Sequence, residues 1–95
     1  MSAYLMVHMT VSDPEQYQVY AKAVVPLIET HGGRFTIRGG KVETLEGKHD
    51  GRRMVVFEFP SMEALKGFWN SPEYIPVKKL RENAAVLDVW AVEGI

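Results

Sequence analysis

The chain has 95 residues, of which 46% are apolar and 24% are charged, and this composition is ordinary for one small globular domain. The 11 basic and 12 acidic residues leave a formal net charge of −1 without a run of like charge, which argues against a nucleic-acid-binding or membrane-binding surface. The absence of cysteine excludes disulfides, thiolate metal sites and a cysteine nucleophile.

The apolar N-terminal stretch has neither the basic region nor the small-residue cleavage site of a signal peptide. No apolar run approaches the ~18 residues that a membrane-spanning helix needs. With the absence of cysteine, these features predict a cytoplasmic protein that forms a single domain over residues 1–95.

Apolar and other residues alternate over Ala3–Thr10, which predicts a first strand. A helix is expected to begin after Asp13, which can cap it, with Pro14 at the first helical position. Its apolar residues recur at spacings of three and four as far as Gly32-Gly33, where the helix should stop. Pro26 lies inside this stripe and is expected to kink the helix without ending it.

A β-hairpin is expected next in the chain. Arg34–Arg38 and Lys41–Glu46 flank Gly39-Gly40, and glycines adopt the positive φ angles that a two-residue turn requires. A second turn over Gly47–Gly51 then leads into Arg52–Ser61, which we interpret as the central strand of the sheet.

Two helical segments should follow the central strand. Ser61 can cap a helix over Met62–Asn70. Ser71-Pro72 repeats the combination of cap and proline, and it is expected to open a third helical segment that reaches about Ala84. Pro76 should separate the first turn of that segment from the rest.

A last strand over Val86–Val92 completes an order that matches the split βαβ, ferredoxin-like plan. The predicted fold class is therefore α+β, an antiparallel sheet with strands 3–10 and 52–61 in the middle and with the helices on one face. The wholly apolar rows of the strands should face the helices: Leu5, Val7, Met9, Val55, Phe57, Phe59, Leu87, Val89 and Ala91.

The opposite face of the sheet would be apolar without any element of the chain to cover it. Its expected residues are Tyr4, Met6, His8, Met54, Val56, Glu58 and Trp90. A large exposed apolar patch is unusual on a monomer. We therefore predict a homodimer in which two copies pack sheet to sheet about a two-fold axis, with a monomer as the alternative.

Several short motifs occur in an order that resembles the family called domain of unknown function 1330. They are Asp13-Pro14, Tyr20, Pro26, Gly32-Gly33, Arg38-Gly39-Gly40, Glu46-Gly47, Glu58-Phe59-Pro60-Ser61, Ser71-Pro72-Glu73-Tyr74 and Leu80-Arg81. The resemblance implies the dimeric α/β-barrel superfamily, whose members include cofactor-free monooxygenases, muconolactone-isomerase-like enzymes and haem-dependent proteins. It implies a fold more strongly than an activity.

Glu58 is the first candidate for chemistry, because a carboxylate on an apolar face must be paired or its pKa must rise. A raised pKa would suit a general acid or base. The alternative is a structural ion pair, with Arg38 and Arg81 as the expected partners.

His8 shares this face and is the second candidate for an acid or base, because imidazole titrates near neutrality. By analogy with the superfamily it is also a candidate haem ligand, although the alternative is a histidine at a sheet rim or interface. If Met6 lies opposite Val56, His8 and Glu58 point to opposite ends of the face.

Five further residues are candidates for substrate binding. Arg38 precedes the glycine turn and could hold a carboxylate, and Arg81 could do the same; each could instead pair with an acidic residue. Tyr20, Tyr74 and Trp69 could form the walls of a cavity, or they could simply belong to the core. The remaining histidines have no partner at ligand spacing, so no metal site is expected.

These observations predict a cytoplasmic homodimer with a small cavity, either between sheet and helices or inside the sheet-to-sheet barrel. Its function would be acid/base chemistry, of isomerase or cofactor-free monooxygenase type, on a small aromatic or carboxylate-bearing molecule. The alternative is a non-catalytic ligand-binding or stress-response module. Haem binding through His8 is a third and weaker hypothesis. No cofactor and no nucleic-acid or membrane partner is expected.

Overall fold

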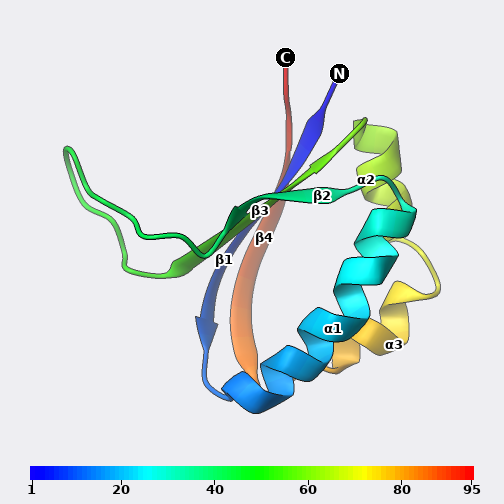
Figure 1. Ribbon diagram of the computed structural model, residues 1–95, viewed down its shortest axis with the longest axis horizontal. Coiled ribbons are helices and arrows are strands. Elements are labelled where there is room, and N and C mark those ends of the chain that lie inside the picture. The colour runs from blue at the N-terminus through cyan, green and yellow to red at the C-terminus, as the bar shows by residue number, and fades with distance from the viewer.

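Four antiparallel strands form one sheet, and all three helices lie on the same side of it (Figure 1). The computed structural model describes all residues, 1–95. The elements are β1 (Ala3–Val11), α1 (Pro14–Thr30), β2 (Arg34–Arg38), β3 (Arg53–Phe59), α2 (Met62–Trp69), α3 (Tyr74–Lys79) and β4 (Ala85–Glu93). The strand order β2-β3-β1-β4 places β3 and β1 in the middle, so the predicted α+β ferredoxin-like plan is confirmed. None of the helices is both long and apolar enough to cross a membrane.

The core lies between the helices and one face of the sheet, which we call the inner face. The predicted apolar rows of β1 and β3 are buried there, and they meet Ile28 of α1 and Phe68 of α2. Phe59, Phe68 and Ile28 are the largest fully buried side chains. The row of β4 is only partly covered, and Ala91 is exposed.

Helix α1 begins and continues as its residues predict. The Asp13 carboxylate accepts a hydrogen bond from the backbone N–H of Gln16 at 3.2 Å, and Pro14 occupies the first turn, where no intrahelical donor is needed. The helix runs through Pro26 to Thr30. Directly after it, Gly33 is buried against Ile28 and Phe59, and a β-carbon on Gly33 would lie 2.5 Å from Ile28 Cγ2.

The hairpin predicted for Lys41–Glu46 is wrong. Strand β2 pairs directly with β3, and residues 39–52 form an arm without strand structure that extends away from the helices (Figure 1). Phe35 of β2 stacks at 4.4 Å on Phe57 of β3, whereas Val42 and Leu45 of the arm are exposed and Leu45 is 91% accessible. Burial of Phe35 therefore outweighs the local turn preference of Gly39-Gly40.

The third helical segment is also shorter than predicted. Helix α3 ends at Lys79, and the chain then turns through Asn83, whose φ is 64°. This turn buries Ala84, whose carbonyl accepts the backbone N–H groups of Ser12 and Asp13. Pro76 lies within the first turn of α3 and does not separate it, because the first-turn N–H groups need no intrahelical partner.

Glu58 lies on the outer face of the sheet, and its ion-pair partner is Arg34, not Arg38 or Arg81. Arg34 Nη2 is 2.5 Å from Glu58 Oε1, and the Tyr4 hydroxyl donates to Glu58 Oε2 at 3.3 Å. Arg34 faces Glu58 directly across β2 and β3, which explains the pairing. Hydrogen bonds from Ser2, Arg34 and Tyr4 hold the pKa of Glu58 below its ordinary value, so the raised pKa of a general acid is not found.

Substitution of Gly33 tests the contact between α1 and β3. We expect Gly33→Ala to lower the free energy of unfolding by about 1–3 kcal/mol, because the added methyl group would overlap Ile28 and Phe59. Urea denaturation measures the change. Gly40→Ala is the control, since its β-carbon would meet no atom within 4 Å, and equal stabilities of the two variants would contradict this packing.

Glu58→Gln tests the outer-face ion pair through pH. The folded protein holds the pKa of Glu58 below its ordinary 4.5, so the stabilisation exists at neutral pH and is lost as the pH falls below about 4.5. We expect the variant to melt at a lower temperature than wild type at pH 7, with the difference disappearing in acid. The control is Glu43→Gln on the exposed arm, and an equal deficit at pH 7 and pH 3 would contradict the assignment.

Candidate functional site

A cavity of about 400 Å³ lies between the inner face of the sheet and helix α1, with side chains from α2 and α3 completing its wall. Every strand and every helix contributes to it, and most of the lining is apolar or aromatic. Its volume falls within the range of about 300–1,000 Å³ that is usual for small-molecule sites. This cavity is therefore the candidate site.

An aromatic cluster from the three helices forms part of the cavity wall. Tyr20 and Tyr74 are buried and their hydroxyl oxygens are 2.9 Å apart, which joins α1 to α3 by a hydrogen bond. The rings of Phe68 and Trp69 pack against Tyr74 at centroid distances of 4.7 and 5.4 Å. Burial raises the pKa of Tyr20, so its hydroxyl stays protonated at any physiological pH.

The exposed part of the wall is cationic. Lys22, Arg38 and Arg53 line the cavity with their side chains at the solvent boundary, and no Asp, Glu or His is among the lining residues. None of the three forms an ion pair with the protein's own carboxylates. The cavity thus combines an apolar interior with an uncompensated positive mouth.

A β-bulge directs Arg38 toward this mouth. Phe35 pairs with Phe57 on the inner face, but the register shifts before Ile37, which pairs with Val56 of the outer row. The residue inserted between Phe35 and Ile37 shifts the alternation by one, so Arg38 points to the inner face. Its guanidinium lies 4.4 Å from the centre of the Phe35 ring.

The structure brings together four of the five residues predicted to bind substrate: Arg38, Tyr20, Trp69 and Tyr74 all line the cavity. Arg81 does not line it, although its guanidinium carbon lies 5.7 Å from the centre of the Tyr20 ring. Its Nε is buried without a hydrogen-bond acceptor. Arg81 therefore supports the wall and does not reach the space inside.

His8 and Glu58 lie on the outer face, away from the cavity. Met6 pairs with Val56, which is the register considered from the sequence, so His8 lies opposite Met54 at one end of the face and Glu58 lies opposite Tyr4 at the other. The His8 ring contacts Trp90 at 5.0 Å. Their roles as acid and base stay predictions, and nothing in the cavity depends on them.

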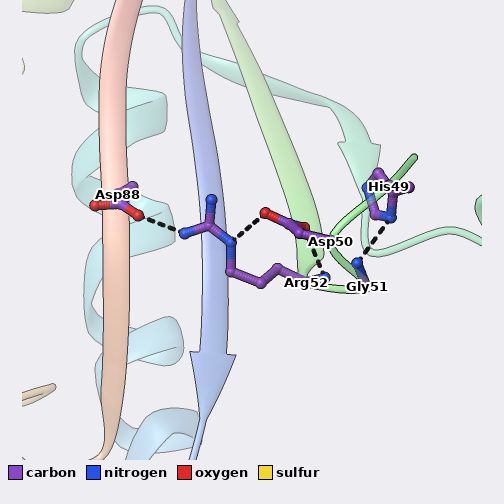
Figure 2. Close-up of polar contacts among 5 residues, drawn as sticks. All are labelled: His49, Asp50, Gly51, Arg52 and Asp88. Carbon is purple, nitrogen blue, oxygen red and sulfur yellow. Dashed lines mark hydrogen bonds and ion pairs between the residues drawn. The ribbon is translucent and has the colours of Figure 1, made fainter. Parts of the chain in front are cut away.

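The polar end of the outer face beside His8 is organised by Arg52. Its side chain crosses β1 and contacts Asp88 of β4, while its Nε donates to Asp50 at 2.8 Å (Figure 2). The backbone N–H of Gly51 donates to His49 Nδ1 at 3.1 Å (Figure 2). These bonds attach the base of the arm to the sheet.

Two cavity residues, Arg53 and Lys22, were not anticipated. Arg53 shares the inner row of β3 with Val55 and Phe57, so the alternation of that strand already placed it on the helix side. Lys22 is an exposed residue of α1 that borders the cavity next to Ala21. No three His, Asp or Glu side chains lie close enough together to hold a metal ion.

Solved structures share this architecture. A protein of unknown function from Rhodopseudomonas palustris is 21% identical, with a TM-score of 0.77 over 99% of this chain and 82% of its own. SnoaB, a cofactor-independent oxygenase from Streptomyces nogalater, is 13% identical, with a TM-score of 0.67 over 99% of this chain and 93% of its own. The de novo designed protein Foldit4 is 12% identical, with a TM-score of 0.63 over the full length of both chains. At these identities the likeness shows the fold alone.

No curated protein matches the sequence. A family model does match it, and it covers all but the first residue. That model is the domain of unknown function called DUF1330, matched over residues 2–95, and the chain belongs to this family.

Proposed function

We propose that the cavity binds a small aromatic molecule that carries an anionic group, and that the protein is an enzyme for cofactor-independent oxygenation of that molecule. The observation that carries the proposal is the unpaired positive mouth of an otherwise apolar cavity. An aromatic ring would gain from burial among Phe68, Trp69 and Tyr74. A carboxylate or phenolate would be paired by Arg38 and Arg53.

The reaction class is supported by the chemistry of the wall and by the fold. The cavity offers no carboxylate or imidazole as a base, so it suits a substrate that enters already ionised. Cations at the mouth favour the ionised form of a bound phenol or enol. SnoaB, described as a cofactor-independent oxygenase, has the same fold.

Binding of a matched pair of probes tests the anion site. We expect 2-naphthoate to bind more tightly than the neutral 2-naphthylmethanol, and Arg38→Gln and Arg53→Gln each to weaken binding of 2-naphthoate about tenfold. Titration calorimetry measures the affinities. Lys66→Gln on α2 lies outside the cavity and should change nothing; equal affinities of the two probes for wild type would contradict the proposal.

Oxygen consumption separates the enzyme from a non-catalytic binding module. We expect 1-hydroxy-2-naphthoate to consume oxygen faster with the protein than without it, and Arg53→Gln to lose most of that gain. An oxygen electrode measures the rate. Tight binding without added oxygen uptake would favour the binding module.

We also propose that two copies pair through the outer face. Val86, Trp90, Val92 and Ile37 are each at least 41% exposed there, and no element of the chain covers them. Met6 lies between Val56 and Trp90 at the middle of this surface. A two-fold axis brings the same apolar patch of both copies together, so a second copy is complementary without any other partner.

Sedimentation velocity tests the dimer. We expect wild type at micromolar concentration to sediment with twice the 10.8 kDa mass of one chain, and Trp90→Lys to shift it to the mass of one chain. Val19→Lys is the matched control, because Val19 is a similarly exposed apolar residue on α1, away from the outer face. A wild-type protein with the mass of a single chain would contradict the pairing.

A further inference from the structure

We infer that the Tyr20–Tyr74 hydroxyl pair is a hydrogen-bond donor site for the bound molecule, which must therefore carry an acceptor oxygen at the end remote from its anion. This inference rests on the proposed function, because it concerns the same cavity. It narrows the ligand class to bipolar aromatic molecules with a carboxylate or phenolate at one end and a carbonyl, ether or phenol oxygen at the other.

The two hydroxyl groups of the pair have more hydrogens to donate than the protein has acceptors for them. Each tyrosine hydroxyl has one hydrogen, and the single bond of 2.9 Å between Tyr20 and Tyr74 uses one of the two. Neither hydroxyl makes another hydrogen bond in the protein. One O–H donor is therefore left without a protein acceptor at a buried position, which is uncommon in folded proteins.

An acceptor for the free O–H group of the pair could lie inside the cavity. Both tyrosines line it; Phe68 and Trp69 pack on the Tyr74 ring, and the Arg81 guanidinium lies over the Tyr20 ring. Tyr17, whose ring packs on Tyr20 at a centroid distance of 5.5 Å, also lines the cavity, but its hydroxyl makes no hydrogen bond to either member of the pair. Burial raises the pKa of Tyr20, so its hydroxyl keeps its hydrogen and does not act as a base.

The two polar sites lie at different parts of the wall. Arg38 and Arg53 are exposed, whereas Tyr20 and Tyr74 are buried, and most of the cavity lining is apolar. A ligand that satisfies both sites must place its anion at the mouth and its oxygen inside. This arrangement binds simple alkyl-substituted aromatic acids less tightly, because they would leave the buried donor unsatisfied.

Two isosteric probes test the inference. 4-Acetylbenzoate presents a carbonyl oxygen opposite its carboxylate, and 4-isopropylbenzoate has the same number of non-hydrogen atoms without an acceptor there. We expect the Tyr20→Phe/Tyr74→Phe double variant to shift the ratio of their affinities about fivefold in favour of 4-isopropylbenzoate, because phenylalanine keeps the ring but removes the donor. Titration calorimetry on wild type and variant measures the ratio.

The single variants and an arginine variant serve as controls. Tyr20→Phe and Tyr74→Phe should each shift the ratio less, because the remaining hydroxyl keeps a free hydrogen. Arg53→Gln should weaken both probes without changing their ratio, since it acts on the shared carboxylate. An unchanged ratio in the double variant, as a water-filled donor site would give, overturns the inference while leaving the anion site intact.

Infrared spectroscopy covers the case in which the double variant does not fold. The isotopically labelled carbonyl of 4-acetylbenzoate bound to wild type should absorb at lower frequency than in an apolar solvent, as it does when it accepts a hydrogen bond. A frequency equal to that in the apolar solvent overturns the inference. If neither probe binds to wild type, both the proposed function and this inference fail.

Discussion

The alternation of side chains along β1 and β3 is the constraint on which the rest of the structure depends. Because successive residues point to opposite faces, Leu5 and Phe57 meet the helices while Met6 and Val56 face away from them. The sheet thus separates two surfaces that do different things. The inner face encloses the cavity, and the outer face leaves apolar side chains such as Trp90 exposed.

The two faces of the sheet also differ in whether their charged side chains are paired. On the outer face the carboxylates are matched: Glu58 pairs with Arg34, and Asp50 and Asp88 pair with Arg52. On the inner face Arg38 and Arg53 have no such partner. Charges that already have a partner stabilise the fold, whereas cations without one next to an apolar space are suited to recognise an external anion.

The shared fold leaves the function to be argued from side chains. A natural oxygenase and a designed protein both superimpose on nearly the whole of this chain. An arrangement common to both carries no information about a reaction. The local features of this chain that bear on function are the bulge that turns Arg38 inward, the hydroxyl pair of Tyr20 and Tyr74, and the aromatic rings that pack on Tyr74.

The sequence by itself determined the order of the elements apart from the strand wrongly expected over Lys41–Glu46, the caps at Asp13 and Ser61, and the inner and outer rows of β1, β3 and β4. Periodicity and capping act over a few neighbouring residues, which is why the sequence carries them. It also identified Arg38, Tyr20, Trp69 and Tyr74 as cavity residues by their chemistry. Only the tertiary structure decided that Glu58 pairs with Arg34, that residues 39–52 form an arm, and that Arg53 joins Arg38 at the mouth. These features depend on strand register and on one bulge, and a register is set by which distant residues bury one another, not by any local pattern.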